Sequence, residues 1–222
     1  MADNNKKEVE ESARSARRLY WEKSWDDDEF SPIWRGRGIA TQVVDSLESG
    51  WFPSTGSVLD IGCGEGVIAQ WFAKLGYQSV GIDISQSVID KARSEHAEES
   101  TKDLLEFHAV DITESSPPDK QYNILIDRGC LHSIPPVLIK NYVKNISAVS
   151  AKGARLLLFV RAFRDGASFN NEMEAKKHVQ VTQKVFAGQF QLKRYAATNI
   201  GSSTDKSKEK QLPGMIFYLE KL

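Results

Sequence analysis

The sequence predicts one α/β domain, with a mostly parallel sheet and helices on both faces. Short apolar runs alternate with segments of helical spacing from Ser57 onward, as in chains built from strand–helix–strand units. A glycine-rich turn directly follows the first apolar run, at the edge where parallel sheets bind ligands. The length of 222 residues suits one domain with additions better than two domains.

Eight elements are predicted in the regular part of the chain. Short runs rich in Val, Ile and Leu predict strands near residues 57–61, 78–82, 104–110, 122–127 and 154–160. The segments between them have helical spacing and predict helices near residues 67–75, 86–95 and 136–149. This alternation is typical of a parallel sheet whose strands are joined by helices.

The chain becomes less regular after Val160. We expect a helix around residues 174–186, a strand around residues 190–196 and a closing strand around residues 215–221. Between the last two strands, residues 201–210 are polar and lack aliphatic side chains, which predicts a mobile loop.

The composition excludes several classes of protein. The 29 Lys and Arg residues nearly balance the 30 Asp and Glu residues, so a net charge of −1 gives no electrostatic support for binding nucleic acid. No apolar run approaches the roughly 20 residues of a membrane span, and the first residues lack the apolar region of a signal peptide. Two cysteines are too few for a disulfide framework. We expect a soluble cytoplasmic protein, with monomer and homodimer both open.

The first fifty residues divide into two segments. Residues 1–18 are polar without apolar periodicity, and we expect a flexible tail or a surface helix there. Residues 19–50 include three of the five tryptophans, between Trp21 and Trp34, interrupted by an acidic run at residues 26–29. This segment is either a lid over a ligand or a helix that packs its aromatic side chains on the core. Residues 51–222 form the main domain.

The first predicted strand runs into the turn Asp60-Ile61-Gly62-Cys63-Gly64-Glu65-Gly66, which precedes a helix. The missing Cβ atoms of the glycines let a ligand approach the backbone, while amide groups and the helix N-terminus face it. The second strand ends near Asp83, 21 residues after Gly62, where a carboxylate accepts hydrogen bonds from ribose hydroxyls. Turn, helix and carboxylate together predict a nucleoside-containing ligand.

The charge of the turn separates two classes of such ligands. A dinucleotide site has the spacing G-x-G-x-x-G and tolerates no anion beside the pyrophosphate, whereas here Gly66 comes one residue early and Val67 follows it. Asp60 and Glu65 would repel a pyrophosphate. They suit a cationic ligand such as S-adenosylmethionine, which carries a sulfonium and an ammonium group. The chain also lacks the P-loop pattern G-x-x-x-x-G-K-[ST].

Three motifs follow one another in the order of a known family: D-I-G-C-G-E-G from Asp60, G-I-D-I-S from Gly81, and D-I at Asp111. Over about residues 55–160 the chain resembles the class I S-adenosylmethionine-dependent methyltransferases. The resemblance implies a Rossmann-like, seven-stranded sheet with an antiparallel last strand, and S-adenosylmethionine as the cofactor. It implies that the methionine part of the cofactor is contacted by Asp60, Gly62, Cys63, Gly64 and Gly66. It implies that Asp83 and Ile84 contact the ribose, and that Asp111 and Ile112 contact the adenine.

A narrower likeness extends over most of the chain. Trp21-x-x-x-Trp25, Ile126-Asp127-Arg128-Gly129-Cys130-Leu131 and the segment at residues 217–222 resemble the thiopurine S-methyltransferase group. This resemblance implies that Trp21 and Trp25 cover the cofactor, that Arg128 lies at the active site, and that the acceptor is a small molecule with a sulfur nucleophile. The glycine turn departs from that group, whose members commonly carry a proline-containing variant.

The end of the fourth strand holds the candidate catalytic residues, because ligands of open α/β sheets bind beyond the carboxyl ends of strands. Asp127 and Arg128 end this strand and are expected to contact the cofactor, and the catalytic candidates are Arg128 and His132, which follows the strand. Arg128 is either an active-site group or the partner of an acid such as Asp26 or Asp27. His132 is either a general base or a packing residue.

The residues leave the acceptor atom open. A thiol ionises near neutral pH, so alignment with the methyl group suffices and no base is needed. An oxygen or nitrogen acceptor must lose a proton, which would require a base such as His132. A non-catalytic module that binds S-adenosylmethionine is a third possibility, because a cofactor site does not establish turnover.

The remaining cysteines and histidines have simpler interpretations. Cys63 and Cys130 fit tight turns as small side chains better than they fit a redox pair. The four histidines are scattered without the spacing of a metal site, so we predict a metal-free enzyme. His178 is expected at the surface or in the wall of the acceptor pocket.

Overall fold

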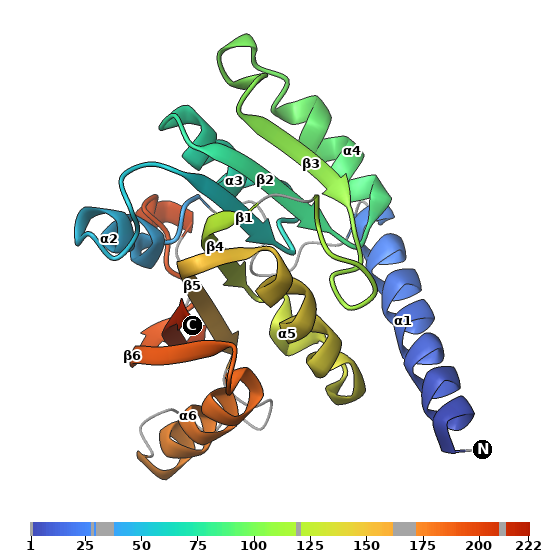
Figure 1. Cartoon of the computed structure of the whole chain (residues 1–222). Coiled ribbons are helices and arrows are strands. Elements are labelled where there is room, and N and C mark those ends of the chain that lie inside the picture. Colours follow the sequence, from blue (N-terminus) through green and yellow to red (C-terminus); the bar gives the residue numbers. More distant parts are fainter. Residues whose placement is uncertain (1, 28, 30–37, 119–120, 162–171, 209–211) are drawn as a thin grey trace.

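Seven strands form one sheet in the computed structural model, in the order β3-β2-β1-β4-β5-β7-β6 (Figure 1). The structure describes residues 2–27, 29, 38–118, 121–161, 172–208 and 212–222. The strands are β1 (Ser57–Ile61), β2 (Gln78–Asp83), β3 (Leu105–Ala109), β4 (Tyr122–Arg128), β5 (Ser150–Arg161), β6 (Phe190–Asn199) and β7 (Pro213–Lys221).

The strand directions match the prediction. The neighbours β3, β2, β1, β4 and β5 pair in parallel, and β7 pairs antiparallel with both β5 and β6. The seven-stranded, mostly parallel sheet with an antiparallel last strand is therefore confirmed. β7 lies between β5 and β6, because the β6–β7 hairpin docks on β5 through its second strand.

Helices cover both faces of the sheet, as the alternating pattern predicted. Val43 packs with Ile124 on one face, and Tyr142 packs with Leu125 on the other. No helix in the described ranges is long and apolar enough to cross a membrane. The helices are α1 (Ala2–Asp26), α2 (Thr41–Glu48), α3 (Val67–Lys74), α4 (Gln86–Glu95), α5 (Ile139–Ala148) and α6 (Glu172–Phe186).

The predicted element boundaries agree with the structure to within four residues. β5 begins at Ser150, earlier than predicted, because Ser150 continues the pairing with Tyr122 of β4. The helix predicted at residues 136–149 divides into a 3-10 turn (Pro136–Leu138) and α5. Two consecutive prolines, Pro135 and Pro136, lack the backbone N–H groups that a longer α-helix would use.

The N-terminal segment is one helix, α1, with no break at residue 18. It runs past the carboxyl end of β3 (Figure 1). Of the two expectations for residues 1–18, the structure has the surface helix, but Arg17 departs from it, because its side chain is buried in an ion pair with Asp111. Phe30 and Trp34 of the predicted lid lie outside the described residues.

Hydrogen bonds hold α1 to the loops that follow β2 and β3. The Glu22 carboxylate accepts the Gln86 and Ser87 N–H groups at 2.9 and 3.1 Å, where its charge favours the N-terminus of α4. Arg18 donates to Glu114 at 2.9 Å. These hydrogen bonds thus hold the helix that carries Trp21 and Trp25 against the segments that follow β2 and β3.

The polar segment after β6 packs more closely than its composition predicted. The sequence indicates a mobile loop at residues 201–210, yet Ser202 and Ser203 are buried. The Thr204 N–H donates to the Ile39 carbonyl at 2.9 Å, and the Ser202 hydroxyl bonds to Gln42. Short polar side chains can be buried without aliphatic neighbours when their polar groups have hydrogen-bond partners. Residues 209–210 lie outside the described residues.

Candidate functional site

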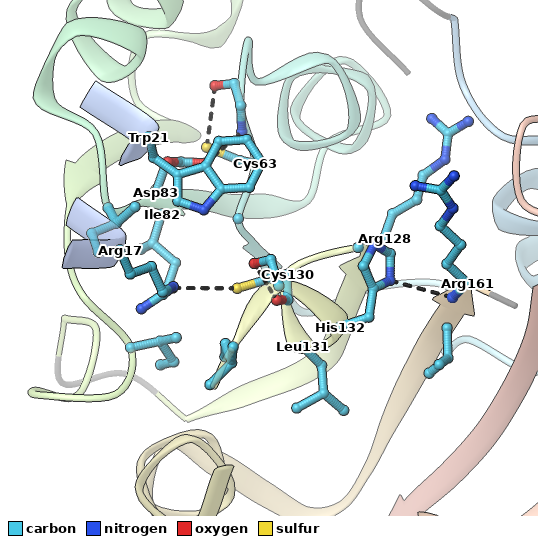
Figure 2. Close-up of a pocket in the computed structure, with 18 of the residues that line it drawn as sticks. Arg17, Trp21, Cys63, Ile82, Asp83, Arg128, Cys130, Leu131, His132 and Arg161 are labelled. Atoms are coloured by element: carbon cyan, nitrogen blue, oxygen red, sulfur yellow. Dashed lines mark hydrogen bonds between the residues drawn. The ribbon is translucent and has the colours of Figure 1, made fainter. Parts of the chain in front are cut away.

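A cavity of about 870 Å³ opens at the carboxyl ends of the parallel strands, between α1 and α6 (Figure 2). Its volume lies in the upper part of the roughly 300–1,000 Å³ range of small-molecule sites. Most of the predicted site residues line it: Trp21, Trp25, Asp60, Gly62, Cys63, Gly64, Asp83, Ile84, Ile112, Arg128 and His132. Gly66, Asp111 and Asp127 do not.

The cavity has two ends that differ in chemistry. The β1–β2 end consists of the glycine turn, Asp60, Asp83 and Ile84, with Trp21 and Trp25 of α1 facing them. The β4–β5 end comprises lining residues from the ends of β4 and β5 and from α6: Arg128, His132, Val160, Arg161, His178, Thr182 and Val185.

The glycine turn at the β1–β2 end requires glycine at two positions. Gly62 and Gly64 have φ values of +68° and +52°, in the left-handed region. A Cβ on Gly62 would lie 2.7 Å from the Cβ of Cys130, and a Cβ on Gly64 would lie 3.3 Å from the Trp25 ring. The turn therefore needs glycine both for its own backbone conformation and because Cys130 and Trp25 pack closely against it.

The carboxylate of Asp83 organises the same turn. It accepts the Gly64 N–H and the Ser85 N–H, each at 3.1 Å, and so links the turn after β1 to the end of β2. Burial raises the pKa of Asp83, and these backbone hydrogen bonds oppose the shift. Asp83 lines the cavity and keeps acceptor capacity, because a carboxylate offers about four lone-pair sites.

Asp60 is a buried carboxyl group at the end of β1. Burial raises its pKa to about 7. Its Oδ2 atom has no hydrogen-bond partner among the described residues, although Asp60 is only 2% exposed. An unpaired buried oxygen is costly, so this position favours a cationic donor group from a ligand. Glu65, the other acid of the turn, pairs instead with Lys91 at 2.7 Å.

Arg17 is a residue of the site that sequence reasoning missed. Its guanidinium donates to Asp111 Oδ1 at 2.8 Å and lies 3.9 Å from the Cys130 sulfur (Figure 2). The Arg17 charge and the Thr113 hydrogen bonds lower the pKa of Asp111 despite its burial. Arg17 stands in a polar helical segment, 94 positions from its partner, so no local pattern indicated the pair.

Two predicted residues lie beneath the cavity. Asp127 is fully buried, and its carboxylate accepts the N–H groups of Gly129, Cys130 and Leu131 at 2.8–3.0 Å and the Tyr142 hydroxyl at 2.7 Å. These four hydrogen bonds use its acceptor capacity to fix the turn after β4. Burial raises its pKa to about 6.

Gly66 also lies away from the cavity. It is the N-cap residue of α3, and a Cβ there would lie 2.4 Å from the Phe107 ring. Glycine is required there by a φ of +76° and by the packing of Phe107 of β3, and not by contact with the cavity.

At the β4–β5 end, Arg128 is the last residue of β4 and His132 lies in the turn that follows. Arg128 donates to the carbonyl groups of Ile200 and Ser202 at 3.3 and 3.0 Å, which fixes the segment after β6. His132 Nδ1 accepts the Arg161 backbone N–H at 3.3 Å. His132 faces the open cavity, but the protein around its ring and the charge of Arg161 lower its pKa to about 4. His132 is therefore neutral at pH 7.

Helix α6 supplies a wall of apolar and polar side chains at this end. His178, Thr182, Val185 and Phe186 recur at helical spacing and line the cavity. His178 and Thr182 are buried at 7% exposure each. His178 therefore belongs to the pocket wall, the less favoured of its two expected positions.

Neither the cysteines nor a metal cluster adds chemistry. Cys63 and Cys130 are free, and burial raises the pKa of both thiols. Within the described ranges, no group of three His, Cys, Asp or Glu side chains could hold a metal ion. The metal-free enzyme stays a prediction.

Comparison with known proteins matches this architecture to one family. A model of the methyltransferase domain matches residues 58–153. An uncharacterized methyltransferase from Schizosaccharomyces pombe is 33% identical over 109 residues, which cover 49% of this chain and 72% of the relative. The chain belongs to the class I S-adenosylmethionine-dependent methyltransferases. The resemblance to this family is thus confirmed, whereas these matches do not confirm the thiopurine-like subgroup.

Two further matches describe the range of this methyltransferase family. The 2-heptyl-1-hydroxyquinolin-4(1H)-one methyltransferase of Mycobacteroides abscessus is 32% identical over 129 residues, or 58% of this chain. The match spans 56% of that relative's length, a little over half. The N-methyltransferase NodS of Bradyrhizobium japonicum, solved with S-adenosyl-L-homocysteine, has a TM-score of 0.61 at 16% identity, covering 92% of this chain and 98% of NodS. This second likeness concerns the fold.

Proposed function

We propose that this chain transfers a methyl group from S-adenosylmethionine to a small-molecule acceptor. The observation that carries the proposal is Asp60 Oδ2, a buried carboxylate oxygen beside the glycine turn without a hydrogen-bond partner among the described residues. The ammonium group of the donor would satisfy this oxygen. The residues at the β1–β2 end of the cavity therefore fit a cationic nucleoside that carries an amino-acid group.

The remaining residues of the β1–β2 end fit the other parts of the donor. Asp83, which has acceptor capacity left, supports a role at the ribose hydroxyls, with Ile84 beside it. Ile112 offers an apolar surface for the adenine. Asp111 anchors Arg17 and contributes through that pair instead of through direct contact.

Five more predicted residues have roles that follow from their positions. Trp21 and Trp25 line the cavity from α1 and would cover the bound donor. Cys63, a small side chain of the turn, leaves room for the donor at the backbone. Gly66 and Asp127 are positioning residues, because each fixes a turn without lining the cavity.

Alignment is the main catalytic contribution of the chain. Bound S-adenosylmethionine supplies an electrophilic methyl group. The glycine turn holds the donor end, and the α6 wall excludes water from the acceptor end, so that the nucleophile is held about 3–3.5 Å from the methyl carbon. Neutral His132 faces this space and can accept a proton, although its lowered pKa makes it a weak base.

The acceptor atom is a thiol sulfur or a hydroxyl oxygen. The resemblance to the thiopurine group supports sulfur, for which alignment alone suffices. The name of the mycobacterial relative supports a hydroxyl, because that protein acts on a hydroxyquinolinone. His132→Gln separates the two: a thiol acceptor loses little rate, whereas a hydroxyl acceptor loses about a hundredfold.

Calorimetry and turnover test the proposal together. S-adenosylmethionine and S-adenosylhomocysteine are titrated into the protein, and a panel of thiols, phenols and amines is then screened for S-adenosylhomocysteine release. Micromolar binding with turnover of one class supports the proposal. Binding without any turnover would favour a non-catalytic module, and no binding would contradict the donor site.

A further inference from the structure

Apart from Arg17, whose guanidinium is paired with Asp111, the charged side chains that line the cavity are separated by sign. The carboxylates among the described lining residues all belong to the β1–β2 end: Asp60, Glu65 and Asp83. At the β4–β5 end the charged lining groups are the guanidinium groups of Arg128 and Arg161. A single ligand of one charge does not fit both ends, whereas a cationic donor beside an anionic acceptor does.

The two arginines come from neighbouring strands and lie on one face of the sheet. Arg128 pairs with Phe159 in the register of β4 and β5, and Arg161 stands two residues beyond Phe159. Because side chains two positions apart in a strand share a face, the side chains of Arg128 and Arg161 lie on the same face of the sheet. Figure 2 shows them extending from the ends of these strands in the same general direction.

Arg161 differs from Arg128 in its partners. The Arg128 guanidinium binds the carbonyl groups of Ile200 and Ser202 and therefore supports the wall of the cavity. Arg161 uses its backbone N–H for His132, while its guanidinium forms no hydrogen bond or ion pair with the described part of the chain. An exposed guanidinium at a pocket wall suits planar, bidentate recognition of a carboxylate.

The cavity also has an apolar surface, on the face of the sheet that α6 covers. Val160, Val181 and Val185 line the cavity there, together with Leu131 of the turn after β4. Val181 is 58% exposed, although it is a large aliphatic residue on α6. Apolar walls with one or two placed charged groups are typical of sites for amphipathic small molecules.

We propose that the acceptor is an amphipathic molecule, with an apolar body against α6 and a carboxylate or similar anionic group bound by Arg161. This inference rests on the proposed function, because it names the substrate class of the same cavity. It assigns Arg161 as the residue that selects the acceptor, distinct from the residues that bind the donor.

The test compares two molecules that differ only in this charge. The binding of 4-mercaptobenzoate and of its methyl ester is measured by calorimetry on protein saturated with S-adenosylhomocysteine, and 4-hydroxybenzoate and its ester are used in the same way. We expect the acid to bind about tenfold more tightly than the ester, as for a charge-assisted hydrogen bond. The preference should weaken at high salt, because Arg161 is exposed.

Two variants locate the source of the preference. Arg161→Gln should remove the tenfold preference for the acid and leave the affinity for the ester within about twofold. Lys152→Gln is the matched control, since it removes an exposed positive charge from the other end of the same strand. It should leave both affinities unchanged.

The outcomes separate this inference from the proposed function. Equal or tighter binding of the ester by the unmodified protein, no binding of the acid, or a preference that persists in Arg161→Gln would overturn the role of Arg161. None of these results changes donor binding or S-adenosylhomocysteine release, which test the methyltransferase proposal. Conversely, a protein that prefers the acid but binds no donor would support the anion site and contradict the proposed function.

Discussion

The two ends of the cavity are built in different ways. The β1–β2 end comes from two consecutive strand-to-helix turns, and its key contact joins Asp83 to Gly64, 19 residues apart. The β4–β5 end combines strand ends with α6 and with the segment after β6, and its contact from Arg128 to Ser202 spans 74 residues. The proposed donor site thus sits on local motifs, whereas the proposed acceptor site depends on long-range packing. The two ends should respond separately to mutation.

The largest effect is expected from Arg17→Met, which leaves the buried Asp111 carboxylate without its partner. We expect a loss of about 3 kcal/mol in the free energy of unfolding of the ligand-free protein, measured by urea denaturation. Arg17→Met combined with Asp111→Asn should recover part of this loss. Arg18→Met removes an exposed pair with Glu114 and should cost less than about 1 kcal/mol. Equal losses in the two single variants would contradict a buried, structural ion pair.

Asp83→Ala tests the β1–β2 end directly. It removes a carboxylate that supports the glycine turn and is proposed to bind the ribose, so donor affinity should fall by about 2 kcal/mol in calorimetry. Asp90→Ala, an exposed acid on α4, serves as the control and should leave affinity unchanged. The tighter binding of the carboxylic acid than of its methyl ester at the β4–β5 end should persist in Asp83→Ala. If donor affinity does not change, the donor has been assigned to the wrong end.

The pH dependence of donor binding follows from Asp60, whose pKa is raised from 3.8 to about 7. An ammonium group binds the ionised carboxylate, so donor affinity should rise about tenfold between pH 5.5 and pH 7. In Asp60→Asn this rise should disappear. A rise that persists in Asp60→Asn would assign the titration to another group.

The same shift has the opposite effect on the ligand-free protein. The folded state binds the Asp60 proton more tightly than the unfolded chain, so this group's contribution to stability is lost as the pH rises from about 4 to about 7. Asp60→Asn should therefore be more stable than the unmodified protein above pH 7 and gain little below pH 4. Thermal unfolding without ligand at several pH values measures this difference.

The smallest effect is expected from Trp25→Ala. Trp25 lies against Gly64 at the cavity, so its loss should weaken donor binding by about 1 kcal/mol while the melting temperature of the free protein changes little. Leu19→Ala, at an exposed position of the same helix, is the control. A large fall in melting temperature without ligand would instead support core packing as the role of the aromatic segment.

Sequence reasoning predicted the parts of the molecule that depend on neighbouring residues. The glycine turn from Asp60 to Gly66 and the carboxylate of Asp83 follow predicted strands directly, so their convergence at one sheet edge could be expected. The parallel strands and the helices on both faces follow from the same alternation.

The parts that depend on distant partners were missed or assigned incompletely. Arg17 and Arg161 look like ordinary surface charges in the sequence, and only the fold brings one to Asp111 and the other to the cavity. Asp127 was predicted at the cofactor, but its carboxylate is occupied by the turn that follows it. Such hydrogen bonds to the next few residues compete with ligand contacts and leave no separate sequence pattern.

The position of β7 bears on how the enzyme is made. β7 follows β6 in the chain but lies between β5 and β6, and its side chains enter the core on both faces of the sheet. During synthesis, β5 therefore has an open edge until β7 has emerged from the ribosome. The strands and turns of the β1–β2 end emerge earlier, so the nascent chain can form this end of the cavity before the β4–β5 end is complete. With the donor bound at the β1–β2 end as proposed, we expect S-adenosylmethionine to stabilise the folding chain before it acts as a reactant.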